Sequence, residues 1–171
     1  MKIITPVLRY SLLLSLAVTA SIAAATTHHT KHRNQQPILT EQGPVEGVKT
    51  TYGTKFLGIP YAAAPVGALR WQPTQAPQPW DGVLEANATG SSCPQVASPF
   101  GTASINEDCL FLNIYTPKAN KRPGKLPVMV WIHGGSFTYG EGHTFDPQKL
   151  VEKGVIVVNF NYRLGALGFM A

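Results

Sequence analysis

The chain has 171 residues, of which 44% are hydrophobic and 13% are charged. This length suits one ordinary domain with its own core, and the apolar content excludes an intrinsically disordered chain. The formal net charge of +5 is modest, and no stripe of basic residues alternates with aromatic ones, so we predict no nucleic-acid partner.

Residues 1–25 have the pattern of a secretion signal. Lys2 and Arg9 give a positive start, residues 11–25 carry no charge, and Ala23 to Ala25 offer the small side chains that a signal peptidase requires. The apolar stretch is shorter than a comfortable membrane span, so we expect a cleaved signal rather than an anchor. The sequence therefore predicts a secreted or periplasmic protein with no stable membrane insertion after cleavage.

Residues 26–37 are polar and aperiodic, and we expect a disordered lead-in there. Three histidines, a lysine and an arginine gather at residues 28–33. This cluster indicates a solvated tail, with a site for a metal or an anionic surface as the alternative. We predict neither a metal nor a cofactor, and we expect residues 38–171 to form the folded part.

Two short strand patterns open the folded part. Residues 45–50 and 55–59 flank Tyr52 and Gly53, which predicts an antiparallel hairpin that ends at Pro60. Residues 61–95 then hold five prolines and two tryptophans. So many prolines exclude a long helix or a central strand, whereas the aromatic residues argue against a disordered linker. We expect an ordered surface loop.

The second half of the chain has the pattern of an α/β unit. Residues 110–115 resemble a strand, and residues 127–132 form an apolar run that predicts a fully buried strand. Asp146 and Pro147 are typical of a helix start, and we expect the helix to end at Gly154. A buried strand at residues 155–160 would complete a βαβ unit with a parallel pair.

The predicted fold class is therefore α/β, with an antiparallel edge hairpin leading into parallel strands. The sequence ends about ten residues after the strand at 155–160. One face of that strand would still await a partner, so we expect an incomplete domain, the N-terminal portion of a larger one.

The candidate site follows the strand at 127–132. There the chain runs into His133, Gly134, Gly135, Ser136 and Phe137. Two consecutive glycines end the strand and allow backbone N–H groups to approach a ligand. In acyl-transfer enzymes such amides form an oxyanion hole, which stabilises the negative oxygen of a tetrahedral intermediate. An ordinary strand-to-loop turn is the alternative.

The chain contains two cysteines, Cys93 and Cys109. If the protein is exported into an oxidising compartment, a disulfide between them is chemically reasonable. Two separate buried thiols are the alternative.

Four blocks of sequence resemble the type-B carboxylesterases, the family of carboxylesterases and cholinesterases. They occur in the family's order and lie at residues 56–71, 107–117, 127–137 and 161–169. The resemblance covers nearly everything from Gly43 to the last residue. It implies an α/β-hydrolase fold and a serine esterase that acts on small carboxylic esters through an acyl-enzyme.

The resemblance implies that Gly135 and Ser136 donate their amides to the oxyanion hole, while Gly134 shapes the loop. The family's nucleophile lies in a G-x-S-x-G elbow, and this sequence contains no such pattern. By family position, neither Ser136 nor His133 belongs to the catalytic triad. We therefore expect the chain alone to be inactive, with the nucleophile, acid and histidine absent from it.

The resemblance also implies a Cys93–Cys109 disulfide and a partly buried ion pair between Arg70 and Glu107. Leu69 and Trp71 flank the arginine, so its charge would need a partner if it were buried. Two other functions stay open: a catalytically inactive, cholinesterase-like binding or adhesion protein, and a truncated product without function. The sequence leaves the oligomeric state unknown.

Overall fold

The computed structural model describes residues 36–118 and 124–170. The predicted signal at 1–25, the histidine cluster at 28–33 and nearly all of the lead-in at 26–37 lie outside these residues, so they stay predictions. Within the described part, no helix is both long enough and apolar enough to cross a bilayer.

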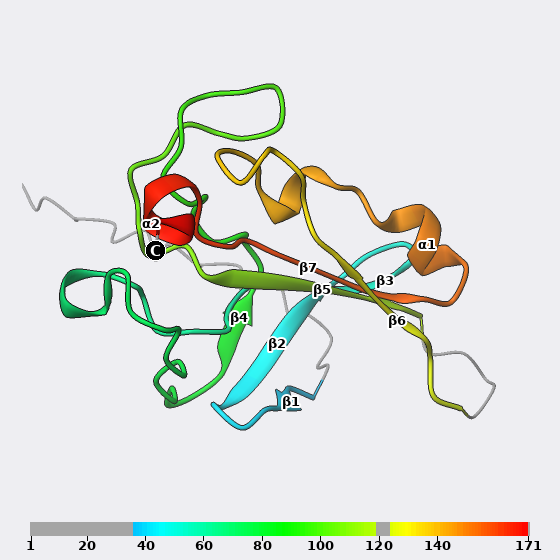
Figure 1. The fold of residues 1–171 in the computed structure, drawn as a ribbon. Coiled ribbons are helices and arrows are strands. Elements are labelled where there is room, and N and C mark those ends of the chain that lie inside the picture. The colour runs from blue at the N-terminus through cyan, green and yellow to red at the C-terminus, as the bar shows by residue number, and fades with distance from the viewer. Residues whose placement is uncertain (1–35, 119–123, 171) are drawn as a thin grey trace, which may run out of the picture. The chain divides into compact units, whose positions relative to one another are not determined.

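A mixed seven-stranded sheet is the main element (Figure 1). Its strands are β1 (Ile38–Leu39), β2 (Pro44–Lys49), β3 (Gly53–Pro60), β4 (Leu84–Ala86), β5 (Phe111–Pro117), β6 (Val128–Trp131) and β7 (Ile156–Phe160). They are ordered β1-β2-β3-β5-β7-β6, with β4 paired to β2. The helices are short: η1 (Gly67–Leu69), η2 (Gly142–Thr144), α1 (Gln148–Glu152) and α2 (Gly165–Phe169).

The predicted hairpin is confirmed as β2 and β3, which pair antiparallel with Val48 opposite Lys55. Thr50 closes its turn, since the Thr50 N–H and hydroxyl both donate to the carbonyl of Gly53. β3 ends at Pro60, as expected for a residue that cannot donate to the sheet.

The predicted βαβ unit is also confirmed. β6 and β7 are parallel, with Trp131 opposite Asn159, and α1 lies between them in the chain. The helix begins one residue later than expected, with Pro147 in place of Asp146 as its N-cap residue, and the Asp146 carboxylate accepts a hydrogen bond from the N–H of Gln148, the first helical residue (3.0 Å). Gly154 follows the helix with φ +87°, a left-handed conformation that favours glycine.

The predicted burial of the strand at 127–132 is wrong. β6 is the last strand on its side of the described sheet and pairs only with β7. Val128, Met129 and Val130 are 59%, 50% and 59% exposed, so both faces of the strand are largely uncovered. The apolar run identifies the strand correctly, but its burial depends on neighbours that the described residues do not supply.

The loop at residues 61–95 is ordered, as predicted. Its two tryptophans connect it to other segments through hydrogen bonds. The Trp80 indole donates to the carbonyl of Pro44 (3.0 Å), and the Trp71 indole donates to that of Ala166 in α2 (3.1 Å). A cluster of buried side chains lies near this loop and consists of Ala62, Cys93, Cys109, Leu110 and Leu164. This cluster joins the segment before α2 to the two cysteines.

Candidate functional site

The segment that follows β6, residues 134–140, is called the glycine loop below. Gly135, Ser136 and Phe137 have φ angles of +117°, +52° and +62°, so three consecutive residues are left-handed. Non-glycine residues rarely adopt such angles. The surrounding structure must therefore hold Ser136 and Phe137 in this conformation.

The carbonyl groups of this region are turned toward the protein and bonded there. The hydrogen bonds run from the Tyr162 hydroxyl to His133 O (2.6 Å), from Thr138 N and Tyr139 N to Gly135 O (2.9 and 3.2 Å), and from Gly165 N to Phe137 O (2.7 Å). The amides behave differently: no described residue accepts a hydrogen bond from the N–H of Gly134, Gly135, Ser136 or Phe137. The loop thus offers four consecutive free donors, with those of Gly135 and Ser136 at the centre.

The two glycines differ in the space around them. A side chain at Gly135 would collide with the backbone of Tyr139, and its φ of +117° already favours glycine. Gly134 has open space where a Cβ would point. Gly135 is therefore required by the fold of the loop, whereas the backbone beside Gly134 is open to an approaching molecule.

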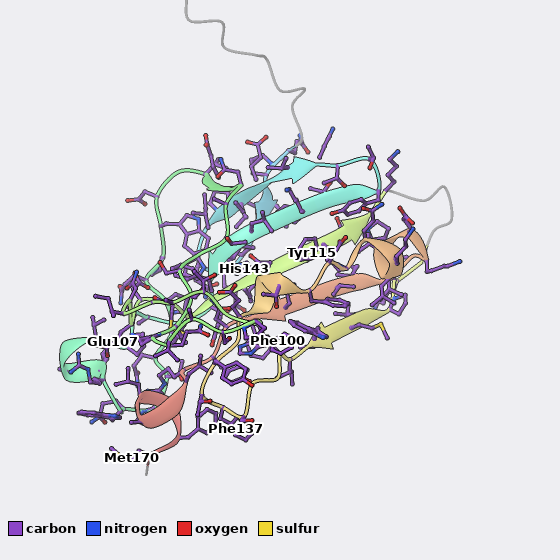
Figure 2. The ribbon with its side chains drawn as sticks, turned by 90° about the horizontal axis from the view of Figure 1, so that it is seen from above. Phe100, Glu107, Tyr115, Phe137, His143 and Met170 are labelled. Carbon is purple, nitrogen blue, oxygen red and sulfur yellow. A yellow bond between two sulfur atoms is a disulfide. The ribbon has the colours of Figure 1, made fainter. Side chains whose placement is uncertain are left out.

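Helix α2 supports the outer end of the loop. Figure 2 shows Phe137 beside this helix, and the Phe137 ring lies 4.5 Å from the Phe169 ring between centroids. Together with the bond from Gly165 to the carbonyl of Phe137, this contact fixes the left-handed turn at its last residue.

His133 lies beneath the loop, only 4% exposed, with its ring stacked on Tyr162 at 4.2 Å and 8°. Its Nδ1 is 2.8 Å from Gly134 O. Since a carbonyl only accepts, Nδ1 carries the hydrogen, and the buried Nε2 has no partner among the described residues. Burial lowers the pKa of His133, only partly offset by the bond to Gly134 and the charge of Glu141. A neutral imidazole supports the loop from within.

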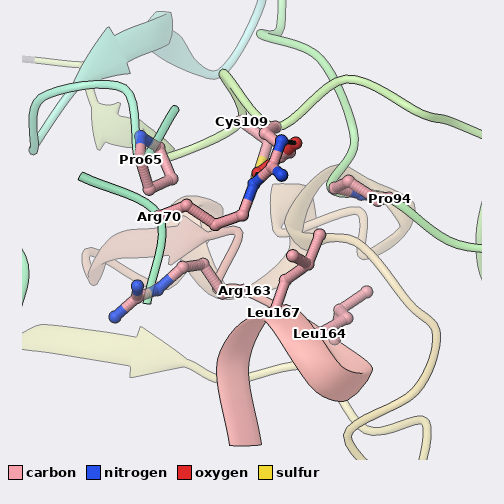
Figure 3. Close-up of a pocket in the computed structure, with 8 residues that line it drawn as sticks. Pro65, Arg70, Pro94, Cys109, Arg163, Leu164 and Leu167 are labelled. Atoms are coloured by element: carbon pink, nitrogen blue, oxygen red, sulfur yellow. Dashed lines mark hydrogen bonds and ion pairs between the residues drawn. The ribbon is translucent and has the colours of Figure 1, made fainter. Parts of the chain in front are cut away.

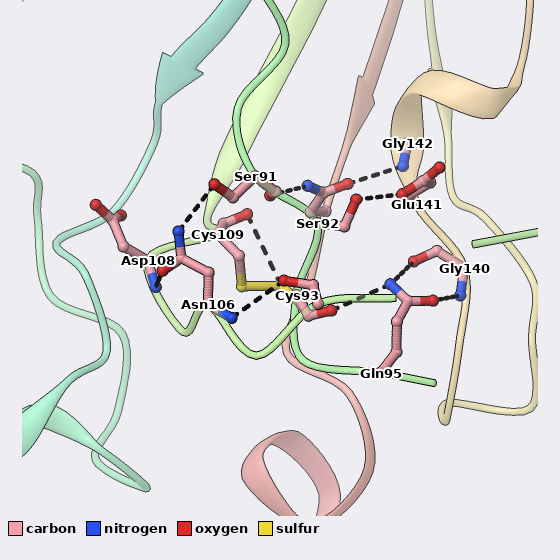
Figure 4. Close-up of a disulfide and its surroundings, with 12 residues drawn as sticks. Ser91, Ser92, Cys93, Gln95, Asn106, Asp108, Cys109, Gly140, Glu141 and Gly142 are labelled. Atoms are coloured by element: carbon pink, nitrogen blue, oxygen red, sulfur yellow. Dashed lines mark hydrogen bonds between the residues drawn. A yellow bond between two sulfur atoms is a disulfide. The ribbon is translucent and has the colours of Figure 1, made fainter. Parts of the chain in front are cut away.

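Cys93 and Cys109 form a disulfide, so the alternative of two separate thiols does not apply (Figure 4). Both are buried, at 1% and 0% exposure, within the cluster that contains Leu164. The disulfide closes a short loop, residues 93–109, which lies against the segment after the glycine loop.

Arg70 and Glu107 form the predicted ion pair, with Arg70 Nε 2.7 Å from Glu107 Oε2 and a second contact from Nη2 to Oε1. The glutamate side chain is 17% exposed and the arginine side chain 41% exposed, so the pair is buried mainly on the glutamate side. The Arg70 guanidinium lies over the Trp71 ring, 5.7 Å from its centroid, and Trp71 is itself 58% exposed. Figure 3 shows the arginine at the rim of a small pocket beside Cys109 and Leu167.

Two residues that sequence reasoning missed connect the end of the glycine loop to residues 92–102. Gln95 hydrogen-bonds Gly140, and the buried Glu141 carboxylate bonds Ser92 and Thr102. Their partners lie 39 to 49 residues away in sequence, so no local sequence pattern predicts these contacts. Among the described residues, no three His, Cys, Asp or Glu side chains are grouped to hold a metal.

Comparison with known proteins places these features in a family. The model of the carboxylesterase family matches residues 34–171. The chain is 45% identical over 137 residues to fumonisin B1 esterase of Sphingopyxis macrogoltabida. The matched region covers 77% of the chain and 25% of that esterase. It is 42% identical over 143 residues to para-nitrobenzyl esterase of Bacillus subtilis (strain 168), covering 79% of the chain and 29% of the esterase.

Solved structures agree with the sequence matches. A PNB esterase superposes with a TM-score of 0.73 at 41% identity, covering 80% of this chain and 30% of that one. A carboxylesterase of Geobacillus stearothermophilus superposes with a TM-score of 0.70 at 38% identity, covering 79% and 28%. The described sheet is thus part of an α/β-hydrolase fold. The chain spans about a quarter to a third of the length of the curated relatives it matches.

Proposed function

The chain belongs to the carboxylesterase family, and from that premise we propose that it supplies the oxyanion-stabilising loop of an exported carboxylic ester hydrolase. The observation that carries the proposal is the run of free N–H groups that includes Gly135 and Ser136, beside carbonyls of His133, Gly135 and Phe137 that accept hydrogen bonds within the protein. Donors fixed in advance of the reaction stabilise charge that develops in the transition state without reorganising.

In the proposed reaction, a serine nucleophile attacks the ester carbonyl and the carbonyl oxygen becomes an oxyanion. The amides of Gly135 and Ser136 donate to that oxygen, and a third donor follows the nucleophile. The sequence contains no G-x-S-x-G elbow, so we assign the nucleophile and its base to residues outside these 171. Ser136 contributes its backbone, and no described base hydrogen-bonds its hydroxyl.

The substrate class is a carboxylic ester with a small acyl group. Several relatives carry ester hydrolase names, among them para-nitrobenzyl esterase and acylcarnitine hydrolase. The Ser136 side chain belongs to the loop that would face the acyl group in the proposed complex, where it leaves less room than glycine would. Export follows from the predicted signal at 1–25 and is supported by the Cys93–Cys109 disulfide, because such bonds persist in oxidising compartments.

The test compares two purified proteins: the 171-residue chain and the protein translated from the complete coding sequence that contains it. We expect the complete protein to hydrolyse p-nitrophenyl acetate and the 171-residue chain to hydrolyse it no faster than a denatured control. A fluorophosphonate should label one serine of the complete protein, and peptide mass spectrometry should locate that serine outside residues 1–171.

Two results would contradict the proposal. Labelling of Ser136 would make its hydroxyl the nucleophile. A folded complete protein with neither labelling nor turnover would instead indicate a binding protein that keeps the fold without the chemistry.

A further inference from the structure

Gln95 holds the end of the glycine loop through its side-chain amide. Its Oε1 accepts a hydrogen bond from the N–H of Gly140 (2.8 Å), and its Nε2 donates to Gly140 O (3.0 Å) and to Cys93 O (3.1 Å) (Figure 4). The backbone of Gln95 is itself fixed, since its N–H and carbonyl both bond Ser104. A firmly anchored side chain therefore satisfies both polar groups of one glycine.

Gly140 connects Gln95 to the part of the glycine loop that carries the free amides. Its φ is +116°, and an added Cβ would collide with the His133 ring and with Gly134 O. Gly140 thus packs directly against the imidazole and the carbonyl that lie behind the free amides. A shift of Gly140 would displace the His133 imidazole and the Gly134 carbonyl.

Glu141 makes a second connection at the next residue. It is 3% exposed, and its carboxylate accepts hydrogen bonds from the Ser92 hydroxyl and from the N–H and hydroxyl of Thr102 (3.3 and 3.1 Å). His143 Nε2 lies 3.2 Å from the same carboxylate. Burial by itself would raise the pKa of Glu141, but these bonds and His143 outweigh it and lower the pKa, so the group is held as an anion.

Both connections run from the disulfide-closed loop, or from Ser92 beside it, to the last residue of the glycine loop, Gly140, or to Glu141 directly after it. We propose that Gln95 and Glu141 are positioning residues, which hold the glycine loop in the conformation that presents the amides of Gly135 and Ser136. This assignment rests on the proposed function for its effect on catalysis. It makes the loop at 93–109 part of the machinery that orients the oxyanion donors, through hydrogen bonds and not only through packing.

The glycine loop needs such support because its backbone is strained. Ser136 and Phe137 occupy left-handed angles that they would leave if the loop were free. Without Gln95, both polar groups of Gly140 lose their partners, and the loop can relax toward right-handed angles. A displacement of about 1 Å at such donors is enough to lower turnover about 100-fold.

The experiment replaces Gln95 by methionine in the protein made from the complete coding sequence. Gln95→Met keeps the length of the side chain and removes its donor and acceptor. The matched control is Gln75→Met, because Gln75 is exposed and its side-chain amide bonds only Pro73 O among the described residues. Thr102→Val, at an exposed residue, removes one donor to Glu141 and serves as the milder second variant if Gln95→Met does not fold.

Two readouts are needed, kinetics with p-nitrophenyl acetate and hydrogen exchange resolved to single amides. We expect Gln95→Met to lower kcat about 10- to 100-fold with KM within about threefold, because the donors matter in the transition state. Exchange should become at least about tenfold faster at Thr138 and Tyr139, whose amides bond Gly135 O and not Gln95. Thr102→Val should lower kcat and accelerate exchange at Thr138 and Tyr139 by smaller factors. Gln75→Met should match the wild type in kcat and in exchange.

Hydrogen exchange tests the positioning of the loop without requiring the protein to be an active esterase. Unchanged exchange at Thr138 and Tyr139 in folded Gln95→Met, or in Thr102→Val if the first variant is unfolded, would overturn it. An unchanged kcat with accelerated exchange would also overturn it. If the wild type hydrolyses no ester while the variant accelerates exchange, the proposed function fails and the structural positioning stands.

Discussion

Ser136 and Phe137 both hold left-handed backbone angles, at a cost on the order of 1–3 kcal/mol for each non-glycine residue. The bonds to Gly135 O and Phe137 O, and the contact with Phe169, supply the opposing stabilisation. A conformation that is held against such a cost is consistent with a functional demand on the backbone, here the exposure of two adjacent amides.

If only the Ser136 amide matters, then Ser136→Ala keeps the donor and loses the hydroxyl. We expect kcat for p-nitrophenyl acetate to stay within about tenfold of the wild type, a barrier change of up to roughly 1.4 kcal/mol. Ser136→Gly keeps the same donor and relieves the left-handed strain, so its resistance to denaturant should equal or exceed that of the wild type. Loss of turnover in a folded Ser136→Ala protein would refute the backbone role.

His133 gives a prediction about protonation. Its folded-state pKa is lowered, mainly by burial, so between that value and the ordinary value of about 6.5 the unfolded chain binds the proton and the folded chain does not. Stability is then fully present above about pH 6.5 and declines as the pH falls through the window below it. The wild type should therefore lose more unfolding free energy between pH 7 and pH 5 than His133→Phe, which keeps the ring stacking on Tyr162.

Nitrogen chemical shifts would test the same point directly. At pH 7 they should report a neutral His133 with hydrogen on Nδ1, because that nitrogen faces the carbonyl of Gly134. Hydrogen on Nε2, or equal pH slopes for the wild type and His133→Phe, would be incompatible with this description.

At the scale of elements, the sequence patterns located five of the seven described strands, but not β1 or β4, which lies within the predicted loop at 61–95. The hairpin of β2 and β3 was predictable from two strand runs around a glycine turn, and α1 from Asp146 and Gly154, because these signals are local. The burial of β6 was predicted wrongly, since burial depends on which strands lie alongside and not on composition. The position of the Arg70 guanidinium over the Trp71 ring was not predicted for a similar reason: Trp71 is bonded to Ala166, which is distant in the sequence.

The glycine loop was predictable in part. Two glycines after a strand indicated free amides, and the family resemblance indicated which ones. The left-handed angles of Ser136 and Phe137 were not predictable, because they are imposed by α2 and by Gly140. Gln95 and Glu141 were missed altogether, since their roles exist only once distant segments meet.

The disulfide-closed loop yields a prediction at this scale. In the chain-entropy model, closing a loop of this length contributes about 3 kcal/mol, so Cys93→Ala/Cys109→Ala should unfold at lower denaturant concentration. The variant should also show a lower kcat with little change in KM, because Gln95 bonds the carbonyl of Cys93 and loses part of its support. Kinetics and denaturant titration of the same preparation check both effects. A destabilised variant with unchanged kcat would confine the disulfide to stability.

At the scale of the whole molecule, the proposal gives the described sheet one part of a catalytic arrangement. The proposed oxyanion donors lie in the loop beyond the carboxyl end of β6, a strand that has a neighbour on one side only in the described sheet. The family relatives are three to four times as long as the matched region, and the sequence has no G-x-S-x-G. In the proposed enzyme, these residues therefore stabilise charge, while residues outside the 171 form and break bonds.

The most direct test is the crystal structure of the complete protein after reaction with a p-nitrophenyl alkylphosphonate, whose phosphoryl oxygen stands in for the oxyanion. We predict that this oxygen lies about 2.7–3.1 Å from the backbone nitrogens of both Gly135 and Ser136, with the phosphorus bonded to a serine outside residues 1–171. A phosphoryl oxygen bound elsewhere, with both amides still free, would contradict the account. So would a phosphorus atom bonded to Ser136 Oγ.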